Sequence, residues 1–302
     1  MPAFLLHATA SDECAARADV PSSFAEAFTR APGARRLGAV FVDLPYFTAF
    51  PLQVVRHFVG RVSLSDPWGH VFHTRGVGRF ALALLESVRR RHLDIRAEGA
   101  AAIAFVGGYL SHHAMDRLIH PIVQCHVREE LARRGGWFES HHTEVEKYQS
   151  LFFHEERFGH DIMGSPYPRE VTGSFPGASP WAARVPAELA SVIESAVVEV
   201  HARAPSRATL DAWLRWTSWY GRLLSGRHGW REGLAALAGD AAALRRRFYV
   251  DTDLAGQVDR ATELTLDYLR AADELLRADA VDRAARVRFL DAVPDVDLDV
   301  GS

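Results

Sequence analysis

Apolar residues follow a helical spacing along most of this chain. Between residues 254 and 278, for example, Leu254, Val258, Ala261, Tyr268 and Leu275 fall on one face of a helix. No run of alternating apolar and polar residues is long enough to build a sheet. The pattern therefore predicts an all-α fold, with helices over residues 2–18, 77–92, 98–134, 140–158, 186–203, 207–225, 230–248 and 254–278.

The segment 98–134 is the predicted central helix. Its first half, from Ala100 to Leu110, is apolar nearly all round, so we expect this half to be buried. Pro121 lies within the segment. Because proline removes a helical hydrogen bond, we expect it to kink or end the helix near His120.

Proline and glycine divide the chain into regions. They are frequent over 164–185, which predicts a loop there. On this basis residues 1–163 form a helical core, and 186–292 form further helices in the same or a second subdomain. The alternating aspartates of 293–302 predict a frayed acidic tail.

Composition and charge exclude several classes of protein. Hydrophobic residues make up 48 % of the 302 residues and charged residues 24 %, which is typical of a globular chain. The formal net charge of −3 provides no basic field for duplex nucleic acid. The longest apolar stretch, residues 100–111, is too short for a transmembrane segment of about 20 residues. Two cysteines, Cys14 and Cys125, and the lack of a leader pattern predict a cytoplasmic protein without disulfides.

Histidine is concentrated in the first half, where 13 of the 15 histidines precede residue 161. His112, Asp116 and His120 are spaced four residues apart, so a helix places all three on one face over roughly 12 Å. That span suits two metal ions that share Asp116 as a bridge. His142 and Glu146 repeat the spacing in the next predicted helix. Nitrogen and oxygen ligands without cysteine suit Zn²⁺, and also Fe²⁺ or Mn²⁺.

The alternative is that such pairs are helix caps or surface pairs, as most isolated His-x3-Asp pairs are. His113 points about 100° away from His112 and is not expected to bind metal. The remaining histidines are interpreted as surface or ordinarily hydrogen-bonded side chains: His57, His92, His126, His154, His160, His201 and His228.

Five segments in order resemble the zinc-dependent phospholipase C family, whose all-helical superfamily also contains the S1/P1-type nucleases. The segments are Gly108–Pro121 with its His-x3-Asp-x3-His-Pro, His142-Thr143-Glu144-Val145-Glu146, the start Met1-Pro2 with His7, the stretch Gly38–Phe47, and Trp68–His73. They cover residues 1–160. In the last segment, comparison of Thr74–Phe80 with the family pattern favours His73 over His70 as the matching histidine.

The resemblance implies a multi-helix bundle of the phospholipase C/P1 nuclease type whose core, residues 1–163, binds metal. The implied ligands are His7, Asp43, His73, His112, Asp116, His120, His142 and Glu146. Two or three Zn²⁺ ions are expected, since secreted members supply one further ligand through a freed N-terminal tryptophan that Met-Pro does not match. Asp43 would also position or deprotonate the attacking water. Tyr46 and Phe47 would line the substrate pocket, unless they belong to the core.

The function implied is metal-assisted hydrolysis of a phosphate ester, either a lipid headgroup or a soluble small molecule. A nuclease is less favoured because no basic track with interleaved aromatics is present. Three other hypotheses remain: an HD-type phosphohydrolase built on His160-Asp161, a di-iron oxygenase, and a scaffold in which metal only holds helices together. The oxygenase would need Glu-x-x-His pairs, whereas the pairs here are His-x3-Asp and His-x3-Glu.

Overall fold

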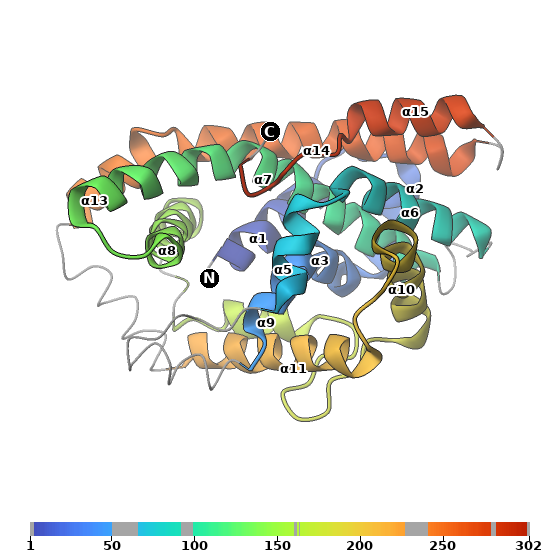
Figure 1. Ribbon diagram of the computed structural model, residues 1–302, viewed down its shortest axis with the longest axis horizontal. Helices are drawn as coiled ribbons and strands as arrows, with labels where there is room; N and C mark the ends of the chain where they lie inside the picture. The colour runs from blue at the N-terminus through green and yellow to red at the C-terminus, as the bar shows by residue number, and fades with distance from the viewer. Residues whose placement is uncertain are drawn as a thin grey trace.

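Every regular element in the described part of the chain is a helix (Figure 1). The computed structural model describes residues 3–49, 66–91, 99–159, 162, 164–226, 241–278 and 282–300. The all-α prediction is therefore confirmed for these residues, and no strand occurs among them. No helix within these ranges is both long and apolar enough to cross a bilayer.

Within the described ranges, fifteen helical elements surround the core. In the first half they are α1 (Ala3–Ala15), α2 (Ser22–Arg30), α3 (Pro32–Val40), the 3-10 helix η1 (Phe41–Phe47), α5 (Pro67–Thr74), α6 (Val77–Arg90), α7 (Gly99–Arg134) and α8 (Phe138–Phe158). In the second half they are α9 (Tyr167–Gly173), α10 (Ala187–His201), α11 (Arg207–Leu224), α13 (Ala241–Arg245), the π-helix η2 (Arg246–Val250), α14 (Leu254–Arg277) and α15 (Arg283–Ala292).

Helix α7 is the element around which the others pack. In Figure 1, α14 and α15 run along one edge of the molecule and α11 along the opposite edge, with α1, α3 and α5 between them. The first half of α7 is buried from Ala102 to Leu110, as its sequence predicts. Up to Ala114 it belongs to the larger hydrophobic cluster, and Met115 to Val127 belong to a smaller cluster with α8, η2 and α14.

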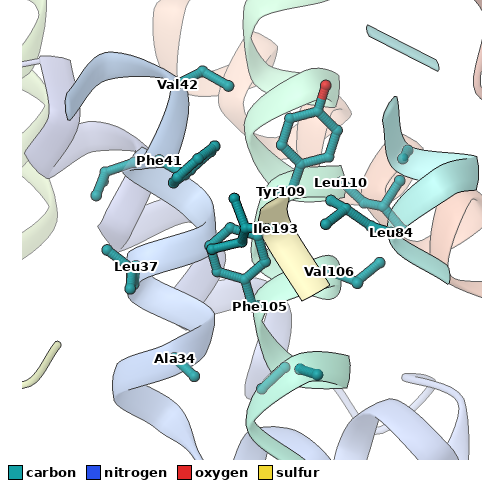
Figure 2. Packing of buried hydrophobic residues seen from close by; sticks show 14 of the residues in the cluster. Ala34, Leu37, Phe41, Val42, Leu84, Phe105, Val106, Tyr109, Leu110 and Ile193 are labelled. Atoms are coloured by element: carbon teal, nitrogen blue, oxygen red, sulfur yellow. The ribbon is translucent and has the colours of Figure 1, made fainter. Parts of the chain in front are cut away.

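Two glycines let α3 and α7 approach closely. A Cβ on Gly38 would lie 2.0 Å from the carbonyl oxygen of Phe105, and one on Gly108 would lie 1.9 Å from that of Arg35. Around this crossing, Leu37 and Phe41 face Phe105 of α7 in the core (Figure 2). Any larger residue at either glycine would push the two helices apart.

Two helical predictions need correction. Helix α7 runs through Pro121 to Arg134 and does not end near His120. Pro121 lies on an exposed face of α7. The proline- and glycine-rich stretch 164–185 contains a short helix, α9, which includes Pro168 because proline is tolerated in a first helical turn.

The acidic tail is not frayed. Val293 and Leu298 are fully buried, so these two apolar residues of the tail belong to the core. The N–H of Leu298 donates to the carbonyl oxygen of His73 at 2.7 Å, and the Gln124 amide donates to that of Asp299 at 2.8 Å. The backbone N–H of Arg79 donates to Asp295. The tail, residues 293–300, thus ties α5, α6 and α7 together.

The α3–α7 crossing yields a stability prediction. Gly108→Ala should lower the free energy of unfolding by about 2–3 kcal/mol, because the added methyl group meets backbone that cannot move aside. Gly173→Ala is the matched control, since nothing lies within 4 Å of its added Cβ, and it should change stability by less than about 1 kcal/mol. Urea unfolding of both variants measures the difference. Equal effects would contradict the close approach.

Candidate metal centre

Eight side chains from five elements meet in one network on the inner face of α7. Helix α1 contributes His7, η1 contributes Asp43 and α5 contributes His73, all within ion-pair distance of another member. The other members are His112, Asp116 and His120 of α7 and His142 and Glu146 of α8. The structure therefore brings together all eight of the side chains singled out in the sequence.

Asp116 lies at the middle of this network. Its Oδ1 is 3.2 Å from Nε2 of His7 and 3.5 Å from Nε2 of His120. Its Oδ2 is 2.8 Å from Nε2 of His112 and 3.6 Å from Nε2 of His73. Four imidazoles thus surround one carboxylate whose side chain is only 1 % exposed.

Three sets of three residues have ligand atoms within 4.8 Å of one another: His7, His112 and Asp116; Asp43, His73 and His112; and His120, His142 and Glu146. His112 belongs to the first two sets, and Asp116 contacts His120 of the third. Each set has the size and the nitrogen–oxygen chemistry of a divalent cation site.

Backbone carbonyls orient two of the imidazoles. The Nδ1 of His112 lies 2.8 Å from the carbonyl oxygen of Ala39, a contact that the α3–α7 crossing makes available. The Nδ1 of His73 lies 2.7 Å from the carbonyl oxygen of Gly69, one turn earlier in α5. Because a carbonyl oxygen holds Nδ1, Nε2 is the nitrogen of each ring that faces the centre, as in metal-bound histidines.

Three of the distances match the spacing of ligands around one metal ion, whereas His142–Glu146 at 2.9 Å is a hydrogen bond and His112–Asp116 at 2.8 Å is shorter than that spacing. A tetrahedral zinc about 2.0–2.1 Å from its ligands holds those ligand atoms about 3.3–3.4 Å apart. The His7–Asp116, His73–Asp43 and His120–Asp116 distances are 3.2, 3.3 and 3.5 Å. Both Oδ atoms of Asp116 are buried and receive no hydrogen bond. A buried carboxylate left in this state is costly, and a bound cation removes that cost.

The carboxylates of the centre stay ionised. Burial favours the neutral acid, but the surrounding imidazoles, His112 first, outweigh it and hold the pKa of Asp116 well below its usual range. The pKa of Asp43 is lowered in the same way, against burial, by His112 and His73. Burial lowers the pKa of His7 to about 4, so that ring is neutral at pH 7. The pKa of Glu146 is also lowered, against burial, by His142 and His120, so the centre has three ionised carboxylates. Against burial, Asp43 and Asp116 raise the pKa of His73 to about 9, and Asp116 and Glu146 raise that of His120 to about 10, so these two rings balance part of the negative charge when no cation is bound.

One edge of the centre is accessible. His112, Asp116 and His73 are at most 2 % exposed, whereas the side chains of Asp43 and His142 are 18 % and 21 % exposed. A ligand can therefore approach from the Asp43–His142 side. Structural metal sites are closed, whereas catalytic sites keep an accessible position.

The two aromatic residues predicted to line the pocket differ in position. The ring of Tyr46 lies 5.6 Å from that of His73 and is half-buried, beside the accessible edge. Phe47 is buried in the core, with its ring 5.7 Å from Phe4 and 5.1 Å from Tyr220. Phe47 is therefore a packing residue, and the structure does not place it in a pocket wall.

Sequence reasoning missed Asp299 and the carbonyls that orient the histidines. The Oδ2 of Asp299 is 3.4 Å from Nδ1 of His70, which faces the tail and not the centre. The negative charge of Asp299 also helps to raise the pKa of His73 to about 9, although burial opposes this and Asp43 contributes more. No motif in the sequence marks Asp299, because only the packing of the tail brings it near the centre.

Histidines outside the centre make ordinary contacts. His126 lies 3.3 Å from a carboxylate oxygen of Glu129. His113 is buried with its Nε2 3.0 Å from the carbonyl oxygen of Pro294. Each ring therefore has one polar contact, while the other nitrogen, Nε2 of His126 and Nδ1 of His113, is buried without a hydrogen-bond partner in the described structure. Four others lie outside the described residues, and so does the His160-Asp161 dipeptide: His57, His92, His160 and His228.

No family model, no curated protein and no solved structure matches this chain. The function is therefore argued from the geometry and chemistry of the centre.

A buried histidine near the centre gives a pH prediction. The Nε2 of His154 lies 2.8 Å from the Thr9 hydroxyl and its Nδ1 lies 2.6 Å from the Ser150 carbonyl oxygen. Burial lowers its pKa to about 4. As pH falls, this ring is therefore protonated in the unfolded chain at a higher pH than in the folded protein. The stability that His154 contributes is present above about pH 6.5 and is lost towards its folded pKa.

His154→Gln removes the titrating group but keeps a polar side chain. Between about pH 7.5 and pH 5, the wild type should lose roughly 2 kcal/mol more unfolding free energy than this variant. Urea unfolding at both pH values measures the difference. Identical losses would show that His154 is protonated in the folded protein.

Proposed function

We propose that this protein is a metal-dependent phosphoester hydrolase, similar to the zinc-dependent phospholipase C family in its helical bundle and in its centre. The observation that carries the proposal is the convergence of eight histidine, aspartate and glutamate side chains around the buried, unsatisfied Asp116. No other cluster in the described residues joins so many metal-binding side chains.

The three sets would hold two or three divalent ions. His7, His112 and Asp116 form the deepest set, and Asp43 and His73 face the accessible edge. His7 groups with His112 and Asp116 at the heart of the centre. Zn²⁺ is the preferred ion for such a ligand set, and Fe²⁺ and Mn²⁺ accept the same donors.

Zinc bound here would neutralise the negative charge of a phosphoryl group and lower the pKa of a bound water. Asp43 is the side chain that would accept the proton of that water. It lies at the accessible edge, its Oδ1 is 3.3 Å from His73 Nε2, and its pKa is lowered by the imidazoles despite burial. As an ionised carboxylate it accepts a hydrogen bond from water and orients it.

The substrate class that fits is a phosphate ester, either a lipid headgroup or a small soluble ester. Tyr46 stands beside His73 at the accessible edge and would contact the organic part of the ester. The lack of a side chain at Gly69 leaves room for this ring, because a Cβ there would lie 2.8 Å from the Tyr46 ring. Because tyrosine combines an apolar ring with a polar hydroxyl, it can contact both the apolar and the polar parts of a substrate.

A non-catalytic scaffold is the second candidate, and one observation favours it. Most of the centre is buried, with His112, Asp116 and His73 nearly inaccessible, as in metal sites that only join helices. The partial exposure of Asp43 and His142 favours the hydrolase. The di-iron hypothesis gains no support, since the pairs are His112–Asp116 and His142–Glu146 at four-residue spacing.

Metal content tests the centre directly. The purified protein should retain two or three zinc ions per chain by elemental analysis. Asp116→Asn should weaken zinc binding by more than the roughly 10–100-fold typical of an outer-shell change, because Asp116 contacts four of the imidazoles. His154→Gln is the control, since that buried histidine lies outside the centre, and it should keep its metal. A wild-type chain without stoichiometric transition metal would refute the proposal.

Hydrolysis separates the enzyme from the scaffold. Zinc-loaded protein should cleave bis(p-nitrophenyl) phosphate, and a chelator should abolish the reaction. Asp43→Asn should lower kcat by about 100-fold or more while some zinc stays bound, because the group that handles the water proton is lost. Zinc-loaded protein that cleaves neither this diester nor p-nitrophenyl phosphate would favour the scaffold.

A further inference from the structure

A cleft lies on the opposite side of α5 from the metal centre. It has a volume of about 660 Å³ and is bordered by α5, the start of α6, the end of α10 and the tail. Trp68 and Val71 of α5 line it, and they point about 140–160° away from His73 around the helix. The cleft and the metal centre are therefore separate sites that share one helix as a wall.

Three arginines from different segments line this cleft, namely Arg75, Arg79 and Arg203. Arg79 is neutralised by the tail, because its Nε lies 2.5 Å from Oδ2 of Asp295. Arg203 lies over the Trp68 ring, with 5.5 Å from its guanidinium carbon to the ring centroid. Neither Arg75 nor Arg203 forms an ion pair with a carboxylate of the described residues.

The one further acid of the cleft offsets only one of these two charges. Asp297 lines the cleft, but its Oδ1 accepts the backbone N–H of Asp299 at 2.9 Å. Its carboxylate is thus already used to shape the tail. Two guanidinium groups against one engaged carboxylate leave the cleft with a positive balance.

A buried polar atom adds a second indication of a ligand. His201 lines the cleft and its Nε2 is buried without a hydrogen-bond partner in the described structure. Burial, with Arg79 and Arg75 nearby, lowers the pKa of His201. A neutral imidazole has one N–H to donate and one nitrogen to accept, so this ring can bond to an uncharged or anionic oxygen.

We propose that this cleft binds a small phosphorylated molecule. Guanidinium groups match phosphate oxygens in pairs of hydrogen bonds, and Arg75 and Arg203 approach the cleft from α5 and from the end of α10. His201 supplies a further polar contact. A cleft of this volume suits a small molecule, whereas nucleic acid needs a continuous basic track. The site does not depend on the proposed hydrolase activity.

Calorimetric titration of the zinc-loaded protein with glycerol 3-phosphate and, separately, with inorganic phosphate tests the proposal. Arg203→Gln and Arg75→Gln should each weaken binding of glycerol 3-phosphate at least 10-fold. Arg215→Gln is the matched control, because Arg215 also lies over a tryptophan ring, 5.7 Å from that of Trp216, but does not line the cleft. It should bind as the wild type does.

A second variant separates this cleft from the metal centre, which could also bind phosphate. Asp116→Asn disrupts the centre but should still bind glycerol 3-phosphate at the cleft. This is the binding that Arg203→Gln should remove. Binding of inorganic phosphate as tightly as of glycerol 3-phosphate would show that the phosphate group alone is recognised, and weaker binding would show that the organic part contributes. The proposal is overturned if the wild type binds neither probe, or if both arginine variants bind like Arg215→Gln. The proposal is also overturned if Asp116→Asn, in which both arginines are intact, binds neither probe.

Discussion

A buried carboxylate that accepts no hydrogen bond is the constraint on which this structure depends. Asp116 is enclosed by imidazoles from α1, α5 and α7, and its two oxygens have no donor of adequate geometry. Positive charge has to come from protonated histidines or from cations. Three of the distances within the centre suit cations, and the accessible edge at Asp43 gives them a chemical use.

The rest of the fold supports this arrangement. Gly38 and Gly108 allow α3 to lie close enough to α7 for the Ala39 carbonyl to reach His112. The carbonyl of Gly69 orients His73 in the same manner from within α5. Backbone groups cannot be altered by changing a side chain, so the orientation of both rings is a property of the helix packing itself.

The sequence predicted some parts of the molecule well, for identifiable reasons. Helical periodicity located α7 and α14 closely, and the four-residue spacing of His112 and Asp116 placed them on one face because both lie on a single helix. His7, Asp43 and His73 lie on three other elements. No local pattern determines how those elements pack, so only the family resemblance pointed to these residues.

Errors arose where proline predicted a helix end or a loop and where aspartates predicted a frayed tail. Pro121 lies within α7 and Pro168 lies in the first turn of α9, since a proline is tolerated in a first turn or on an exposed face. The aspartates of the tail concealed Val293 and Leu298, whose burial depends on contacts with distant helices. Such long-range contacts leave no periodic signal in the sequence.

The tail also has a consequence for how the protein matures. All eight predicted ligands precede residue 147, whereas the segment that bonds to the His73 carbonyl follows residue 293. During synthesis on the ribosome the ligands emerge first, and α5 gains its final anchor only when the last helices have been made. A nascent chain therefore carries every ligand before it has the contact that completes the support of His73.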